Sequence, residues 1–177
     1  MVMSQTPGLT IRRGTVADAG LLSELGARTF SETFAADNTP ENLAAYIATS
    51  FNVARIKGQL EDPASTFLIA EIDGRAAGYA RLHDGEPAQG VEGAKPIELV
   101  RLYVTREWIG RGIGAQLMRA CIDEARQTGH DSIWLGVWEQ NPHAQAFYRK
   151  WNFRTFGEHI FQLGADRQTD LLMERTL

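Results

Sequence analysis

The stretch Trp108-Ile109-Gly110-Arg111-Gly112-Ile113-Gly114-Ala115 decides the fold of this chain. It separates an alternating apolar pattern, which ends at Val104, from an amphipathic helix pattern that runs from Gly114 to about Thr128. Glycines in alternating positions at the start of a helix leave a row of backbone N–H groups with no side chains in front of them. Such amides, together with the positive end of the helix dipole, bind phosphate groups. The stretch therefore predicts a site for a ligand that carries phosphate.

Three kinds of phosphate-binding loop compete for this turn. A P-loop NTPase requires Lys and then Ser or Thr after its last glycine, and Ala115-Gln116 stands there instead. A dinucleotide fingerprint is formally matched by Gly110-x-Gly112-x-x-Ala115, with Glu139 in the place of its ribose-binding acid. In that fold, however, the first glycine follows the strand almost directly, whereas Thr105 to Ile109 intervene here. A nicotinamide-dependent oxidoreductase therefore remains only a distant alternative, and the third kind of loop depends on the flanking sequence.

The composition is typical of one globular domain over residues 1–177. It is 44% hydrophobic and 23% charged, and the net charge of -4 comes from interspersed residues of both signs. No basic stripe and no long apolar run occurs, so we expect neither nucleic acid nor a membrane as a partner. Cys121 is the one cysteine and shares a helix face with Leu117, which predicts a buried core residue. With no signal-peptide pattern at the N-terminus, these features predict a cytoplasmic protein.

The apolar periodicity predicts a mixed sheet with helices on its faces. The expected helices begin near residue 18, cover most of 30–63, and span 114–128 and 141–150. Strands are expected over 9–13, 66–72, 76–82, 98–104 and 132–138, with a final hairpin of 153–163 and 169–174. The order is therefore one strand, a long helical stretch, three strands, and then helix, strand, helix and two strands.

Further segments flank the glycine turn in a recurrent order: Leu99-Val100-Arg101-Leu102-Tyr103-Val104 before it, and Trp134-Leu135-Gly136-Val137, Asn141, Ala146-Phe147-Tyr148 and Phe153 after it. With the turn, they closely resemble the Gcn5-related N-acetyltransferase (GNAT) superfamily. The order of elements matches over nearly the whole chain, and the specific motifs lie between about Ile97 and Phe153. One position departs from the family pattern. Ile109 stands where the loop usually begins with Gln or Arg, which removes one side-chain contact with the ligand.

The resemblance implies an α/β (α+β) fold with a mixed, mostly antiparallel sheet of about seven strands, splayed between the fourth and fifth strands and flanked by about four helices. It implies acetyl-CoA as the co-substrate and no metal. The pyrophosphate would bind the turn amides, the pantetheine arm would pair with the main chain of the fourth strand, and an N–H near Leu102 would polarise the thioester carbonyl. The implied cofactor-binding residues are Leu102, Tyr103, Val104, Gly110, Arg111, Gly112, Ile113, Gly114, Ala115, Asn141 and Tyr148.

The resemblance also implies the catalytic residues. Tyr148 matches the tyrosine that protonates the leaving CoA thiolate. Because an alkylammonium has a pKa near 10, only about one amine molecule in a thousand is nucleophilic at neutral pH, so a base must remove the proton. Glu98 occupies the position where many family members carry this glutamate, and Glu139 and His159 are further candidates.

The acceptor is expected to be a primary amine of a small molecule, acetylated by direct attack in a ternary complex. Phe30, Phe34 and Glu139 are expected to line its site. The segments 138–141 and 157–170 look like the PaiA-type spermidine/spermine N-acetyltransferases, and Glu32, Glu98, Glu139 and Glu158 would attract a polyamine. Two alternatives stay open: a protein or peptide N-acetyltransferase, and a CoA-binding regulatory module without catalysis. The final hairpin often pairs with a second copy in this superfamily, which implies a homodimer.

Overall fold

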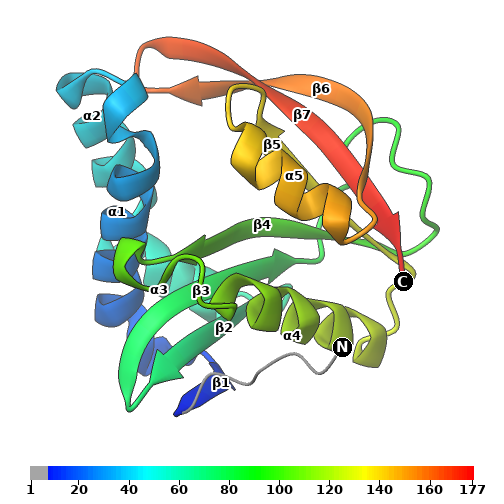
Figure 1. Cartoon of the computed structure of the whole chain (residues 1–177), viewed down its shortest axis with the longest axis horizontal. Coiled ribbons are helices and arrows are strands. Elements are labelled where there is room, and N and C mark those ends of the chain that lie inside the picture. The colour runs from blue at the N-terminus through cyan, green and yellow to red at the C-terminus, as the bar shows by residue number, and fades with distance from the viewer. Residues whose placement is uncertain (1–7) are drawn as a thin grey trace.

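A seven-stranded sheet forms the centre of the computed structural model, which describes residues 8–177 (Figure 1). Its strand order is β1-β2-β3-β4-β5-β7-β6, and only the β4–β5 pair is parallel. This confirms the mixed, mostly antiparallel sheet. The strands are β1 (Leu9–Arg13), β2 (Ser65–Ile72), β3 (Arg75–His83), β4 (Pro96–Val104), β5 (Ser132–Trp138), β6 (Arg154–Leu163) and β7 (Asp166–Thr176).

Five α-helices surround the sheet within residues 8–177, where the sequence predicts about four: α1 (Ala19–Phe34), α2 (Pro40–Ser50), α3 (Val53–Glu61), α4 (Ile113–Gln127) and α5 (Pro142–Lys150). The additional helix arises because the expected helical stretch over 30–63 breaks at Phe51. The Asn52 side chain accepts a hydrogen bond from the amide of Arg55 at 2.8 Å and so begins α3. Phe51, which ends α2, is only 2% exposed. No helix of the described residues is long and apolar enough to cross a membrane.

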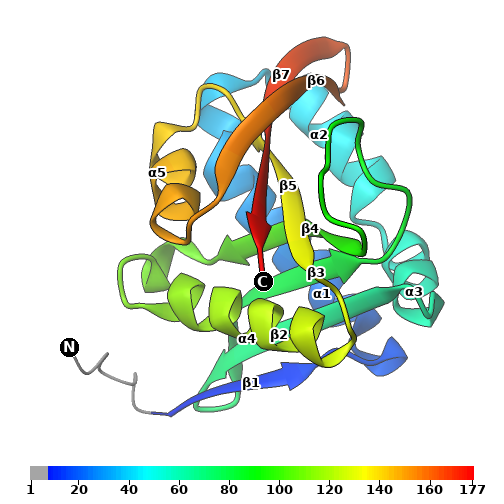
Figure 2. The ribbon, with the colours of Figure 1, turned by 90° about the vertical axis from the view of Figure 1, so that its right-hand side faces the viewer.

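The two faces of the sheet carry separate hydrophobic clusters. On one face, Ile97 and Leu99 of β4 pack with Ile133 of β5 and Cys121 of α4. On the other face, α1 and α3 cover β2 and β3, with Phe51 near the centre of the cluster. Figure 2 shows α4 and the helices α1 and α3 on opposite sides of β2 and β3. The prediction for Cys121 is confirmed, because its side chain is fully buried and burial raises the pKa of its thiol.

The sheet opens between its fourth and fifth strands, as predicted. β4 and β5 pair only at Pro96–Ser132, Ile97–Ile133 and Glu98–Trp134. Beyond these positions β4 continues beside β3 alone, and β5 continues beside β7 alone. Figure 2 shows β4 and β5 running apart in different directions. The edge of β4 that faces β5 therefore has no neighbouring strand over residues 99–104.

A β-bulge in β4 lies next to this opening. Leu99 pairs with Leu82 and Arg101 pairs with Arg81, so Val100 is an extra residue without a partner on β3. A bulge changes the face to which the following side chains point. Here it directs Arg101 to the α1–α3 face, where its guanidinium lies 4.5 Å from the centre of the Phe51 ring.

Candidate active site

The glycine turn forms an open cradle at the end of β4. Gly110 and Gly112 have φ values of +80° and +83°, in the left-handed region that favours glycine. A Cβ at either position would meet no atom within 4 Å, so the turn faces open space. Thr105 anchors the start of the turn, because its amide donates to the carbonyl of Ala77 on β3 at 2.9 Å.

The amides of this cradle are available to a ligand. Gly112 caps α4 without any side-chain hydrogen bond, and the first amide to donate into the helix is that of Gln116, to the carbonyl of Gly112 at 3.1 Å. The amide of Arg111 donates weakly to the carbonyl of Trp108 at 3.4 Å. Within residues 8–177, no acceptor engages the remaining amides of the predicted row: Gly110, Gly112, Ile113, Gly114 and Ala115. These donors and the helix dipole fit a phosphate group.

The cradle is continuous with the opening in the sheet. A Cβ on Gly114 would lie 3.8 Å from the ring of Phe147 on α5 and 3.9 Å from Val104 on β4. The start of α4 therefore meets both α5 and the last residue of β4. The main chain of Leu102, Tyr103 and Val104 runs from the cradle along the unpaired edge of β4. An elongated ligand bound at the cradle would thus lie along the edge that the sequence predicts for the pantetheine arm.

The helix α5 borders the opening on the α4 face. Asn141 caps it, with its Oδ1 accepting from the amide of Ala144 at 3.1 Å. The buried Gln145 ties the helix to the end of β5, because its Nε2 donates to the carbonyls of Trp138 at 3.1 Å and Glu139 at 2.8 Å. These contacts determine where the next turn of α5 lies.

Tyr148 lies on that next turn and is half-buried against the α4-face cluster. Its ring packs edge-on against Phe153, with 5.7 Å between the ring centres. Burial raises the pKa of its phenol, and the nearby Cys121 thiol adds to the shift. A phenol in this state keeps its proton at all ordinary pH values and is suited to donate it rather than to accept one.

Glu98 lies on the other face of the sheet. Its neighbours Ile97 and Leu99 point into the α4-face cluster, so its own side chain points toward the α1–α3 face. Burial raises the pKa of its carboxyl, and the charges of His83, Arg81 and His159 oppose that shift. The structure therefore places the two predicted catalytic residues, Glu98 and Tyr148, on opposite faces of the opened sheet.

Aromatic residues line the α1–α3 face next to the opening. Phe34, at the end of α1, is half-buried, and its ring centre lies 5.8 Å from that of Trp138 on β5. Phe30 lies one turn earlier and is only 3% exposed. Its ring centre lies 4.5 Å from that of Phe34 and 4.6 Å from that of Tyr46. Of the two predicted phenylalanines, only Phe34 reaches the surface beside the opening, and the buried Phe30 packs against it.

The predicted acidic residues do not form one cluster. Glu32 forms an ion pair with Arg28 at 3.0 Å and accepts from the amide of Arg106 at 2.8 Å. Glu139 and Glu158 are exposed, the first after the end of β5 and the second on β6. Glu98 alone of the four is half-buried beside the opening without an ion pair of 4 Å or less among the described residues.

Sequence reasoning missed one acidic residue of this face. Asp170 of β7 lies directly opposite His159 of β6, and their side chains approach to 3.6 Å between Oδ2 and Nε2. Burial raises the pKa of Asp170, whereas His159 lowers it. The available signal was the expected hairpin, but a one-residue change in its turn would have paired other residues.

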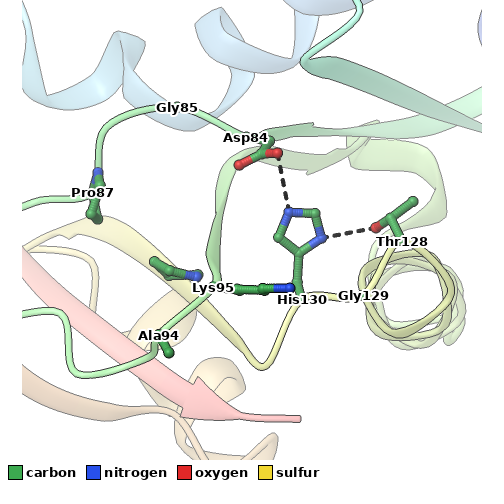
Figure 3. A pocket seen from close by; sticks show the side chains of 9 residues that line it. Asp84, Gly85, Pro87, Ala94, Lys95, Thr128, Gly129 and His130 are labelled. Carbon is green, nitrogen blue, oxygen red and sulfur yellow. Dashed lines mark hydrogen bonds and ion pairs between the residues drawn. The ribbon is translucent and has the colours of Figure 1, made fainter.

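A separate hollow of about 350 Å³ lies at the opposite end of β4 (Figure 3). Pro96 and Lys95 line it, with His130 held between Asp84, at 3.4 Å, and the Thr128 hydroxyl, at 2.9 Å. The hollow lies at the start of β4, whereas the glycine cradle follows the end of the same strand. Among residues 8–177 no group of three or more His, Cys, Asp or Glu side chains could hold a metal ion.

Comparison with known proteins agrees with this geometry. The family model described as the acetyltransferase (GNAT) family matches residues 27–153. An N-acetyltransferase of Lactobacillus delbrueckii subsp. lactis, itself uncharacterised, is 36% identical over 154 residues, which cover 86% of this chain and 88% of the relative. An uncharacterised N-acetyltransferase of Mycobacterium bovis is 35% identical over 162 residues, covering 92% of this chain and 99% of the relative.

A solved structure shows the same fold. The crystal structure of the PaiA N-acetyltransferase from Thermoplasma acidophilum in complex with coenzyme A matches with a TM-score of 0.75 and 21% identity, over 96% of this chain and 99% of that one. The chain belongs to the GNAT acetyltransferase family and is an N-acetyltransferase. Enzymes of this family take their acetyl group from acetyl-CoA, which is accordingly the donor substrate here.

Proposed function

We propose that this protein transfers the acetyl group of acetyl-CoA to a primary amine of a small molecule, by direct attack in a ternary complex. One observation carries the proposal. The opening between β4 and β5 begins at Glu98, lies beside Tyr148 and ends at the glycine cradle, where the amides of Gly112, Ile113, Gly114 and Ala115 have no acceptor among residues 8–177. A donor held along β4 would therefore have a candidate base on one face and a candidate acid on the other.

The donor would bind mainly through the backbone. The amides from Gly110 to Ala115 would hold the pyrophosphate, with the N-terminal end of α4 adding its dipole. The pantetheine arm would pair with the main chain of Leu102 to Val104, and Asn141 would contact it at the start of α5. An N–H near Leu102 would then stabilise the negative charge that develops on the thioester oxygen.

The chemistry needs protons to move in opposite directions at the two ends of the reacting centre. Glu98, whose pKa is raised by burial, would take a proton from the acceptor's ammonium group directly or through water. The freed amine attacks the thioester carbonyl carbon, the nitrogen loses its second proton, and the C–S bond breaks. Tyr148, which burial keeps protonated, would donate its proton to the departing sulfur.

The charged and aromatic residues of the acceptor side bear on which amine is the substrate. A polyamine is the candidate from the sequence, yet Glu32 is already paired with Arg28, and Glu139 and Glu158 are exposed. The aromatic edge formed by Phe34 and Trp138 supports a small acceptor that contacts the end of α1. A panel of candidate acceptors therefore tests whether the amine is a polyamine.

Two measurements test the proposed function. Calorimetric titration of acetyl-CoA should give saturable heat, and no heat at millimolar ligand would refute the donor site. A thiol-release assay should then be run with spermidine, spermine, amino acids, aryl-alkylamines and short peptides. Turnover of free amines alone supports the proposal, turnover of peptides alone replaces it with a peptide N-acetyltransferase, and binding without any turnover indicates a CoA-binding regulator.

We further propose that the protein forms a homodimer and acts in the cytoplasm. β6 is an edge strand and exposes Ile160 by 54%, which supports pairing with a second copy of the chain. A unimodal monomer mass in light scattering at high concentration would refute the homodimer. The buried, unpaired Cys121 is consistent with action in the reducing cytoplasm, which fractionation of the native protein would test.

A further inference from the structure

The pair formed by His159 and Asp170 lies over the backbone of β5 where the sheet opens. A Cβ on Gly136 would be 3.3 Å from Asp170 Oδ2 and 3.5 Å from His159 Nε2. Gly136 follows Trp134, the last residue of β5 that pairs with β4, by two positions. The absence of a side chain at Gly136 therefore lets the imidazole and the carboxylate approach the inner end of the opening.

The pair faces the acceptor side of the sheet. Phe161, two residues after His159 on β6, packs against Tyr46 of α2 with 5.4 Å between ring centres, so both residues share the α1–α3 face. Glu98 points to the same face from β4. The Glu98 carboxyl is close enough to His159 for the charge of the imidazole to lower the pKa of the carboxyl. Glu98 thus lies on β4, which forms one edge of the opening, and His159 lies two strands beyond β5, which forms the other edge.

The two side chains differ in exposure, which suits a proton acceptor held by an anchor. The Asp170 side chain is 15% exposed, whereas that of His159 is 44% exposed. When Nε2 of the imidazole points at Asp170, Nδ1 is left to accept a proton. No hydrogen bond engages Nδ1 within the described part of the chain. The carboxylate would stabilise the imidazolium that then forms.

Acetyl transfer requires such a second acceptor. An ammonium nitrogen carries three protons and the amide product carries one, so two protons must leave it. One reaches CoA by way of Tyr148, which donates to the sulfur and is then reprotonated, and the other is released to water. We propose that His159, oriented by Asp170, accepts one of these two protons while Glu98 accepts the other. This inference rests on the acetyl-transfer function proposed above.

The neutral imidazole Nδ1 takes H⁺ from the substrate nitrogen, whose lone pair forms or completes the N–C bond as the C–S bond breaks. The electron pair of that bond goes to sulfur, which takes the proton of Tyr148. His159 and Glu98 return their two protons to solvent, Tyr148 regains one from solvent, and one proton is released for each acetyl group transferred. The titratable and charged groups around the pair are Glu98 of β4, on which His159 acts together with Arg81 and His83 of β3, and Tyr46 of α2, which packs against Phe161 on the same face.

The test uses the full-length protein, acetyl-CoA and spermidine, or the amine from the panel above that turns over fastest. We expect H159A to lower kcat/KM for the amine about 10- to 100-fold. Calorimetric affinity for acetyl-CoA should stay within about threefold. Free imidazole at tens of millimolar should restore several-fold activity to H159A and none to E98Q. The matched control is His143→Ala, an exposed histidine of α5, which should match the wild type with or without imidazole.

A second variant separates orientation from folding. D170N keeps the imidazole but removes its negative partner, so the acidic limb of the kcat/KM profile should move to lower pH, with a loss of about fivefold at neutral pH. Wild-type kcat/KM in H159A, or a loss that imidazole does not restore together with an unmoved limb in D170N, overturns the inference. If the wild-type protein acetylated no amine, the proposed function itself would fail. An active wild type with an equally active H159A removes only the role of His159.

Discussion

Glu98 of β4 and Trp134 of β5 are the last two residues to pair before these strands diverge. The side chain of Glu98 therefore lies at the inner end of the opening, on the face opposite to Tyr148. The position of the carboxylate follows from the register of a parallel strand pair and not from any local motif. This relationship makes each part of the site separately testable.

Replacing Glu98 tests the base. Glu98→Gln should lower kcat/KM for the amine about 100-fold, because the amide cannot accept a proton. The carboxyl works only when ionised, and its raised pKa moves the acidic limb of the wild-type profile above the pH at which an ordinary glutamate ionises. Removing it should eliminate that part of the limb in a pH series of kcat/KM. Glu24→Gln, on the exposed surface of α1, serves as the control, and equal profiles for the two variants would clear Glu98 of the role.

The hydroxyl of Tyr148 is expected to act on the leaving group. Tyr148→Phe should reduce kcat about 100-fold while the calorimetric affinity for acetyl-CoA changes less than about threefold. The ring still packs against Phe153, so the loss reflects the missing proton donor and not the fold. Tyr46→Phe, on α2, is the matched loss of a hydroxyl and should be neutral. An unchanged kcat in Tyr148→Phe would show that the thiolate gains its proton elsewhere.

Gly112 and Gly129 offer a matched pair at the two ends of α4. Both have φ near +80°, at +83° and +82°, and a Cβ at either would meet nothing within 4 Å. Alanine at each should cost about 1 kcal/mol of folding stability in urea unfolding, because alanine is strained in this region. Only Gly112→Ala should also weaken acetyl-CoA binding, by about tenfold or more, since its methyl group enters the cradle. Equal affinities in the two variants would place the phosphate site elsewhere.

Phe34 tests the acceptor side of the opening. Phe34→Ala removes its contacts with Phe30 and Trp138 and should raise the KM for the amine about tenfold, with a smaller effect on kcat. The KM for acetyl-CoA should be unaffected, because the donor is expected on β4. Leu21→Ala, at an exposed position of the same helix, controls for the helix. A change confined to the KM of acetyl-CoA would contradict this assignment.

The ion pair of Arg12 and Asp18 should make stability depend on acid. Two hydrogen bonds from the guanidinium, at 2.8 and 3.0 Å, lower the pKa of Asp18 from 3.8 to about 2. A carboxyl with a lowered pKa stabilises the fold above its unfolded pKa, and the contribution disappears as the pH falls from about 4 to about 2. Because Arg12 is 40% exposed, we expect Asp18→Asn to cost only about 1 kcal/mol at pH 7. Urea unfolding should find this difference at pH 7 and a smaller one at pH 3. A difference that does not depend on pH would point to a purely structural role of the carboxylate.

Much of the architecture could be read from contiguous residues. The glycine turn, the caps at Thr39 and Asn141 and the position of Tyr148 on α5 are local features, determined by backbone freedom and helical spacing. The periodicity of apolar residues likewise predicted the order of helices and strands along the chain and the buried position of Cys121. Each of these features depends on residues that are close together in the chain. They can therefore be predicted without knowledge of the rest of the fold.

The sequence by itself thus determined the family, the glycine turn before α4 and the position of Tyr148 on α5. Only the tertiary structure decided that the helical stretch breaks at Phe51, that Val100 bulges, that Phe30 is buried below Phe34, and that His159 and Asp170 meet over Gly136. The physical reason is register. Which side chains share the acceptor face depends on pairings between strands that are distant in the chain, and a shift of one residue in any of them would turn those side chains to the other face.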